Sequence, residues 1–232
     1  NPQVKRADFT ADGKFFVLTM KGESALVWDA KTLQVLQPLV FAGSPVSNII
    51  GLELIPSLNR AILHGFAPVK DAPDERSLAV VLWDAANHRT VAFLSDPGSD
   101  TRLTETSDDG TRVAVCSWDG LCDIRDTESG ELIQQLDLAD KGLTTAKFSP
   151  NNKHLITAGT DGVRISEIET GLEIFQLKGV DSVLELELDW EHDQLITLNA
   201  ESVLDFWSLT DGTHLKSMAK LDELGWCEWV RR

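Results

Sequence analysis

Short apolar runs of four to seven residues, separated by Gly, Asp and Asn, recur along the whole chain. The segment Ser107–Leu136 is the most regular example, with apolar runs at Val113–Cys116, Leu121–Ile124 and Leu132–Leu136. Turn signals at Asp119-Gly120 and around Gly130 separate these runs, so the segment predicts three short antiparallel strands. A helical repeat would need apolar residues spaced by about 3.6 positions over a dozen residues. The pattern therefore predicts an all-β chain.

The same pattern recurs five times, at intervals of 45, 52, 42 and 40 residues. The copies begin at Thr10, Ile55, Ser107, Ser149 and Asp189. An interval of about 40 to 45 residues is typical of one four-stranded blade of a β-propeller. A further apolar run before each copy supplies the fourth strand: Val4–Phe9, Ile49–Leu54, Arg102–Thr106, Leu143–Phe148 and Val183–Leu188. We therefore expect a β-propeller domain over 1–232, with antiparallel blades at 1–40, 41–95, 96–138, 139–178 and 179–221.

Two segments depart from the repeat. Gly65–Ser77 contains two prolines and mixed charges, and it is expected to be an exposed insertion rather than a strand. The last stretch, 222–232, predicts the first strand of a sixth blade. The chain is therefore expected to be part of a larger propeller or to close with a partner. Blade edges left open would otherwise promote self-association.

The ends of two predicted third strands carry a Trp-Asp pair, Trp28-Asp29 and Trp83-Asp84. With the repeat length, these pairs make the chain resemble the WD-repeat propeller family. That family links a Gly-His pair, a Ser or Thr, a turn Asp and the Trp in a hydrogen-bond network. The resemblance implies that Asp119 and Asp161 are the turn aspartates, with Ser117 and Thr160 as the hydroxyl partners. No histidine occupies the Gly-His position, so stability should rest more on apolar stacking between blades.

Composition restricts the partners. The chain carries a formal net charge of −16 and has a pI near 4.6, which argues against nucleic acid or an anionic membrane surface as the main partner. The acidity favours a basic partner or simple solubility. The cysteines, Cys116, Cys122 and Cys227, form no metal-knuckle spacing. They are expected to be reduced thiols, and the protein to be cytoplasmic.

No combination of a nucleophile, a base and an orienting group is visible, so we predict no catalytic residues, no cofactor and no metal site. His192 lies between Glu191 and Asp193, but consecutive residues in a short turn point in different directions. The recurring Asp-Gly pairs are typical of tight turns and lack the spacing of a calcium loop. An enzyme that uses channel carboxylates, with Glu185 and Glu187 as first candidates, is the alternative.

Binding is the favoured class of function. In the WD-repeat geometry, the loops that join strand d to the next strand a lie on the same face as the b–c turns. The predicted partner-binding residues on this face are Asp96, Asp100, Arg102, Trp118, Asp140, Lys141, Asp181, Asp222 and Glu223. Their acidic excess predicts a non-catalytic interaction or regulatory module that binds a basic protein or peptide. Trp118 is either an exposed anchor or a residue buried against a neighbouring blade. A structural segment that assembles with other chains through open blade edges is a further alternative.

Overall fold

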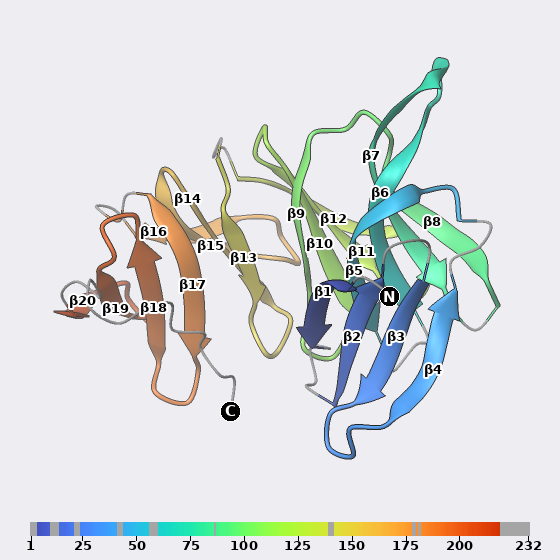
Figure 1. Cartoon of the computed structure of the whole chain (residues 1–232). Helices are drawn as coiled ribbons and strands as arrows, with labels where there is room; N and C mark the ends of the chain where they lie inside the picture. Colours follow the sequence, from blue (N-terminus) through green and yellow to red (C-terminus); the bar gives the residue numbers. More distant parts are fainter. Residues whose placement is uncertain are drawn as a thin grey trace. The chain divides into compact units, whose positions relative to one another are not determined.

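The structure is a computed structural model that describes residues 4–9, 14–20, 24–40, 44–55, 60–85, 87–138, 142–177, 180 and 182–218. Within these ranges the chain forms five four-stranded sheets, each ordered as its strands follow in the sequence and paired antiparallel (Figure 1). The all-β expectation with four-stranded blades is confirmed. The described part of the chain contains no helix with the length and apolar character needed to cross a bilayer.

The chain divides into two compact units, 1–117 with 121–136, and 118–120 with 137–232. Blade 1 comprises β1 (Val4–Phe9), β2 (Phe15–Met20), β3 (Ser24–Asp29) and β4 (Val35–Val40). Blade 2 comprises β5 (Ser47–Ile55), β6 (Arg60–Val69), β7 (Ala72–Asp84) and β8 (Arg89–Ser95). Blade 3 comprises β9 (Thr101–Thr106), β10 (Arg112–Ser117), β11 (Leu121–Asp126) and β12 (Leu132–Asp137).

The second unit holds the strands of blades 4 and 5. Blade 4 comprises β13 (Thr145–Phe148), β14 (His154–Gly159), β15 (Gly162–Glu167) and β16 (Glu173–Leu177). Blade 5 comprises β17 (Val183–Asp189), β18 (Gln194–Asn199), β19 (Leu204–Ser208) and β20 (His214–Met218).

The turn between the first and second strands is built by the same polar contacts in blades 3 and 4. The backbone N–H of Arg112 donates to Ser107 Oγ at 3.0 Å, and that of Thr111 donates to Asp109 Oδ1 at 2.9 Å. In blade 4, Ser149 and Asn151 accept the corresponding backbone bonds from His154 and Lys153 at 2.9 and 3.0 Å. These side chains accept hydrogen bonds from backbone N–H groups of the turn. The polar residues between the apolar runs therefore form the turns.

An acidic or hydroxyl residue at the end of the third strand shapes the turn into the fourth. In blade 3, Asp126 Oδ1 accepts the backbone N–H groups of Glu128 and Ser129 at 3.0 and 2.7 Å. The turn then passes through Gly130, whose φ is +77°. Asp29 Oδ1 accepts backbone bonds in the same way in blade 1, so the Asp of the Trp-Asp signature acts as a turn cap.

Apolar side chains pack between neighbouring blades within each unit. In the first unit, Val27 of β3 joins the buried cluster of blade 2, and Val113 and Val115 of β10 join a second cluster with Ile62 and Leu82. In the second unit one buried cluster unites residues of both blades, including Ile156 and Leu195. Blade-on-blade packing thus buries the faces that a single sheet would leave wet.

The predicted insertion at Gly65–Ser77 is not a loop, and that expectation was wrong. Strands β6 and β7 run through it and stay paired as far as Val69 and Ala72, which forms a two-stranded ribbon (Figure 1). Pro68 and Pro73 are both exposed in this ribbon. Proline is tolerated at such an edge because no further strand needs the backbone N–H that proline lacks. The predicted sixth-blade strand, 222–232, lies outside the described residues.

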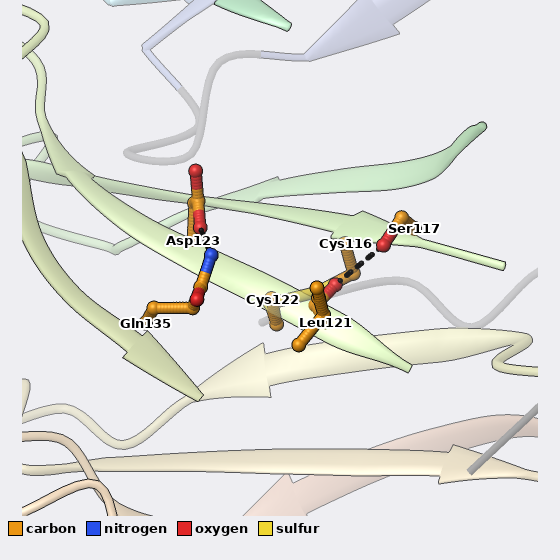
Figure 2. The surroundings of a disulfide bond; sticks show 6 residues. All are labelled: Cys116, Ser117, Leu121, Cys122, Asp123 and Gln135. Atoms are coloured by element: carbon orange, nitrogen blue, oxygen red, sulfur yellow. Dashed lines mark hydrogen bonds between the residues drawn. A yellow bond between two sulfur atoms is a disulfide. The ribbon is translucent and has the colours of Figure 1, made fainter. Parts of the chain in front are cut away.

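Two cysteines also differ from expectation. Cys116 and Cys122 are register partners on β10 and β11, with Cα atoms 4.0 Å apart, and they form a disulfide (Figure 2). The expectation of reduced thiols was therefore wrong for this pair. Their spacing across a hairpin was visible in the sequence, but the register that puts them opposite each other was not. Cys227 lies outside the described residues.

Candidate interaction site

The loop between β8 and β9 is braced by its own hydroxyl groups. Ser95 Oγ lies 2.5 Å from both Ser99 Oγ and Thr101 Oγ1, and the backbone N–H of Ser99 donates to the Asp96 carbonyl at 3.1 Å. These contacts hold the loop together by hydrogen bonds between its own residues. Asp96 and Asp100 are both exposed, so the hydrogen-bonded loop presents two carboxylates to solvent. The sequence predicted the two carboxylates as binding residues but not the hydroxyl contacts that brace the loop.

The register of blade 3 places this loop and the turn of Trp118 at the same end of its sheet. Thr101, the first residue of β9, pairs with Ser117, the last residue of β10. Trp118 is 49% exposed, so about half of its surface is in contact with solvent. Arg102, one residue into β9, is also exposed.

The turn that carries Trp118 is held at its base. The disulfide joins the last register pair of β10 and β11 before the turn, and Ser117 Oγ donates to the Leu121 carbonyl at 2.9 Å (Figure 2). Cys116 and Cys122 are fully buried, whereas Trp118 beyond them is half-exposed. The indole is therefore presented by a constrained hairpin.

The remaining predicted residues of this face lie outside the described residues: Asp140, Lys141, Asp181, Asp222 and Glu223. Of the two predicted turn aspartates, Asp161 Oδ1 lies 3.5 Å from Thr160 Oγ1, at the limit of a hydrogen bond. Asp119 is exposed in the β10–β11 turn, and Ser117 bonds to the backbone.

One polar bond of the signature type occurs in blade 5, where the sequence shows Phe206-Trp207-Ser208. The indole Nε1 of Trp207 donates to Thr197 Oγ1 at 3.0 Å. In blades 1 and 2, Trp28 Nε1 and Trp83 Nε1 are buried without a hydrogen-bond partner. Thr197 stands two residues beyond the register partner of Trp207, and the same place is taken by Leu18 and Leu63 in blades 1 and 2. The orphaned indoles follow from those apolar replacements.

The Asp of the second Trp-Asp pair is held by several hydrogen bonds and ion pairs. The nearly buried Asp84 carboxylate accepts two bonds from Asn87 at 3.0 Å and pairs with Arg60 Nη1 at 2.9 Å. The hydrogen bond from the Asn87 side chain, followed by its backbone N–H and the Arg60 and Arg89 charges, lowers the pKa of Asp84 to about 2. Arg60 also donates to the Glu128 carbonyl at 3.3 Å, which links blade 2 to blade 3.

The described residues hold no group of three or more His, Cys, Asp or Glu side chains that could bind a metal ion. His192 is engaged by Asp189 at 2.8 Å, rather than by its chain neighbours. Glu185 is exposed and Glu187 is half-buried on β17.

A Ser, a His and an Asp meet on the exposed side of blade 5. Ser217 Oγ and Asp205 Oδ1 lie 3.0 and 3.1 Å from the same atom, His214 Nε2. A hydrolytic triad instead needs the carboxylate on one imidazole nitrogen and the nucleophile on the other. Ser217 also donates directly to Asp205. The group is therefore a surface hydrogen-bond cluster without the geometry of a nucleophile.

Comparison with solved structures identifies the architecture. The C-terminal WD40 domain of Sif2 superposes with a TM-score of 0.67 at 18% sequence identity, over 94% of this chain. The chain has the WD40 fold. The match covers 58% of the Sif2 domain, so the chain spans less than two thirds of that WD40 propeller. No protein-family model matches the chain.

Proposed function

We propose that this WD40 chain is a non-catalytic interaction module that binds a basic segment of a partner protein. The proposed contact surface is the end of blade 3 formed by the β8–β9 loop and the β10–β11 turn. WD40 domains generally serve as scaffolds that bind proteins or peptides. The observation that carries the proposal is the braced Ser95–Thr101 loop, which exposes Asp96 and Asp100.

Bracing matters because a preformed loop loses little conformational entropy when a partner binds. Two exposed carboxylates on such a loop attract and orient Lys or Arg side chains, and the net charge of −16 adds long-range attraction. Trp118 supplies an apolar surface that can pack on the aliphatic stems or stack with a guanidinium. Acidic carboxylates and an aromatic ring together suit a Lys- or Arg-rich segment.

The test measures the affinity of a fluorescein-labelled peptide of about ten residues in which Lys or Arg alternates with Val or Thr. A matched peptide with Glu in place of each basic residue is the control. We expect the basic peptide to bind and the acidic one not to bind. Asp96→Lys with Asp100→Lys should weaken binding by about tenfold or more.

Asp108→Lys with Glu131→Lys is the matched control protein, because it makes the same charge change at exposed positions at the opposite end of blade 3. It should weaken binding much less. Equal losses in the two double variants would mean that only net charge matters. That result, or no binding of the basic peptide, would overturn the proposal.

A further inference from the structure

The ribbon formed by β6 and β7 extends beyond the body of blade 2 (Figure 1). Register pairs continue from Phe66 and Leu78 through Pro68 and Arg76. The four consecutive residues from Pro73 to Arg76 are all exposed. Since neighbouring residues of a strand point to opposite faces, both faces of the ribbon are in solvent there.

One edge of this ribbon has no neighbouring strand. β8 pairs with β7 only between Asp84 and Val80, and the chain then leaves at Ser95 into the Asp96–Asp100 loop. Among the described strands, none pairs with this edge of β7 between Ala72 and Ala79. The edge therefore continues the blade 2 sheet past the point where its last strand stops.

The opposite edge of the ribbon, on β6, is less suited to pairing with a further strand. Ser47 of β5 pairs with Phe66, so β6 is covered up to that residue. Beyond it lies Pro68, which has no N–H to donate. On β7, by contrast, the five residues Asp74–Leu78 contain no proline and are exposed or half-buried, whereas Ala79 is fully buried. Five residues are the usual length of a strand, so the β7 edge can accept one more.

Charge indicates which strand would fit. Asp74 and Glu75 are exposed on the edge strand, with Arg76 as the single cation of the β7 stretch from Ala72 to Ala79. At the other end of the edge, Val80 pairs with Ser95, and the exposed Asp96 follows directly. The edge thus runs between two acidic positions, and a basic strand complements it.

We propose that a basic, extended segment of a partner protein docks as an added antiparallel strand on the β7 edge from Asp74 to Leu78, in line with β8. This inference rests on the proposed function and gives it a binding mode. The backbone of the segment would pair with β7, and its Lys or Arg side chains would meet Asp74, Glu75 and Asp96. Within the ribbon, Pro68 and Pro73 limit the pairing of an added strand to this stretch of β7.

The decisive experiment uses the unaltered protein and two versions of the basic peptide. In one version the odd-numbered amides are N-methylated, and in the other the even-numbered amides. A paired strand directs alternate N–H groups to its neighbour, so one version should lose at least about tenfold in affinity while the other binds like the parent peptide. Equal affinities of the two versions would overturn the added-strand mode.

A variant in which Pro68–Arg76 is replaced by an Asn-Gly turn removes the exposed part of the edge, and it keeps the buried Ala67 and its register partner Ser77 as the last rung. It should lose binding while its thermal midpoint stays close to that of the parent protein. Asp74→Lys with Glu75→Lys, which leaves the backbone edge in place, should weaken binding by about tenfold. If ribbon removal leaves affinity unchanged while Asp96→Lys with Asp100→Lys abolishes it, the inference fails and the proposed function stands. If the parent peptide does not bind at all, both fail.

Discussion

Trp207 Nε1 donates a hydrogen bond to Thr197 Oγ1 at 3.0 Å in the buried part of blade 5. Thr197→Val keeps the shape of the side chain but leaves the indole N–H without an acceptor. We expect the free energy of unfolding to fall by about 1 to 3 kcal/mol, measured by urea titration. Thr197→Ser, which retains the hydroxyl, should lose only about 1 kcal/mol for the missing methyl group. A Val variant as stable as the parent would show that the bond contributes nothing.

Gly130 packs against the neighbouring blade so closely that a Cβ on it would lie 2.4 Å from Ala92 Cβ. Its φ of +77° also disfavours any side chain. Gly130→Ala should therefore destabilise the protein by about 3 kcal/mol. Adding Ala92→Gly should recover about 1 kcal/mol or more, because it removes the steric overlap and leaves the backbone cost.

Gly98→Ala is the control for that pair. Its φ is +94°, but nothing lies within 4 Å of an added Cβ. The substitution therefore has only the energetic cost of placing a side chain at positive φ. It should lose about 1 to 2 kcal/mol by the same urea titration. Equal losses for Gly98→Ala and Gly130→Ala would contradict the close packing of blades 2 and 3 at Ala92.

Asp84 should make stability depend on acid pH. Its folded-state pKa of about 2 lies below the ordinary 3.8, so the folded protein favours the carboxylate more than the unfolded chain does. The stabilisation is therefore complete above about pH 4 and is lost as pH falls through about 2. Asp84→Asn should be less stable than the parent near pH 6, and the difference should shrink by about 1 kcal/mol near pH 3.

The disulfide gives a chemical prediction. Alkylation of the unfolded, unreduced protein should leave Cys116 and Cys122 unmodified in a peptide mass map. Dithiothreitol should lower the free energy of unfolding by about 2 kcal/mol, as expected for a short closed loop. The Cys116→Ala and Cys122→Ala double variant should be insensitive to dithiothreitol. Alkylation of both thiols without reduction would show that the bond does not form.

The repeat was predictable because turn chemistry is local. The Ser107 and Ser149 turns are held by side chains within five residues of each other, and such contacts leave a clear sequence pattern. The ribbon was missed for the opposite reason. Pro68 and Pro73 usually break strands, but they are tolerated where no further strand needs their N–H. That depends on which edge is free, a property of the folded sheet.

The candidate site was predictable only in part. Asp96, Asp100 and Trp118 were found from their loop positions and are exposed in the structure. The bracing by Ser95 and Thr101 depends on how the loop folds back on itself, which their sequence spacing did not reveal. The cysteine pairing likewise depended on strand register rather than on spacing.

We expect the end of blade 3 that carries the β8–β9 loop to contact a basic segment. Hydrogen exchange of the protein with and without the basic peptide measures this contact. We predict slower exchange of backbone amides in 96–102 and 118–120 when the peptide is bound, with no change in the turns at 107–111 and 126–131. Slower exchange confined to those opposite turns, or no change at 96–102, would contradict the claim.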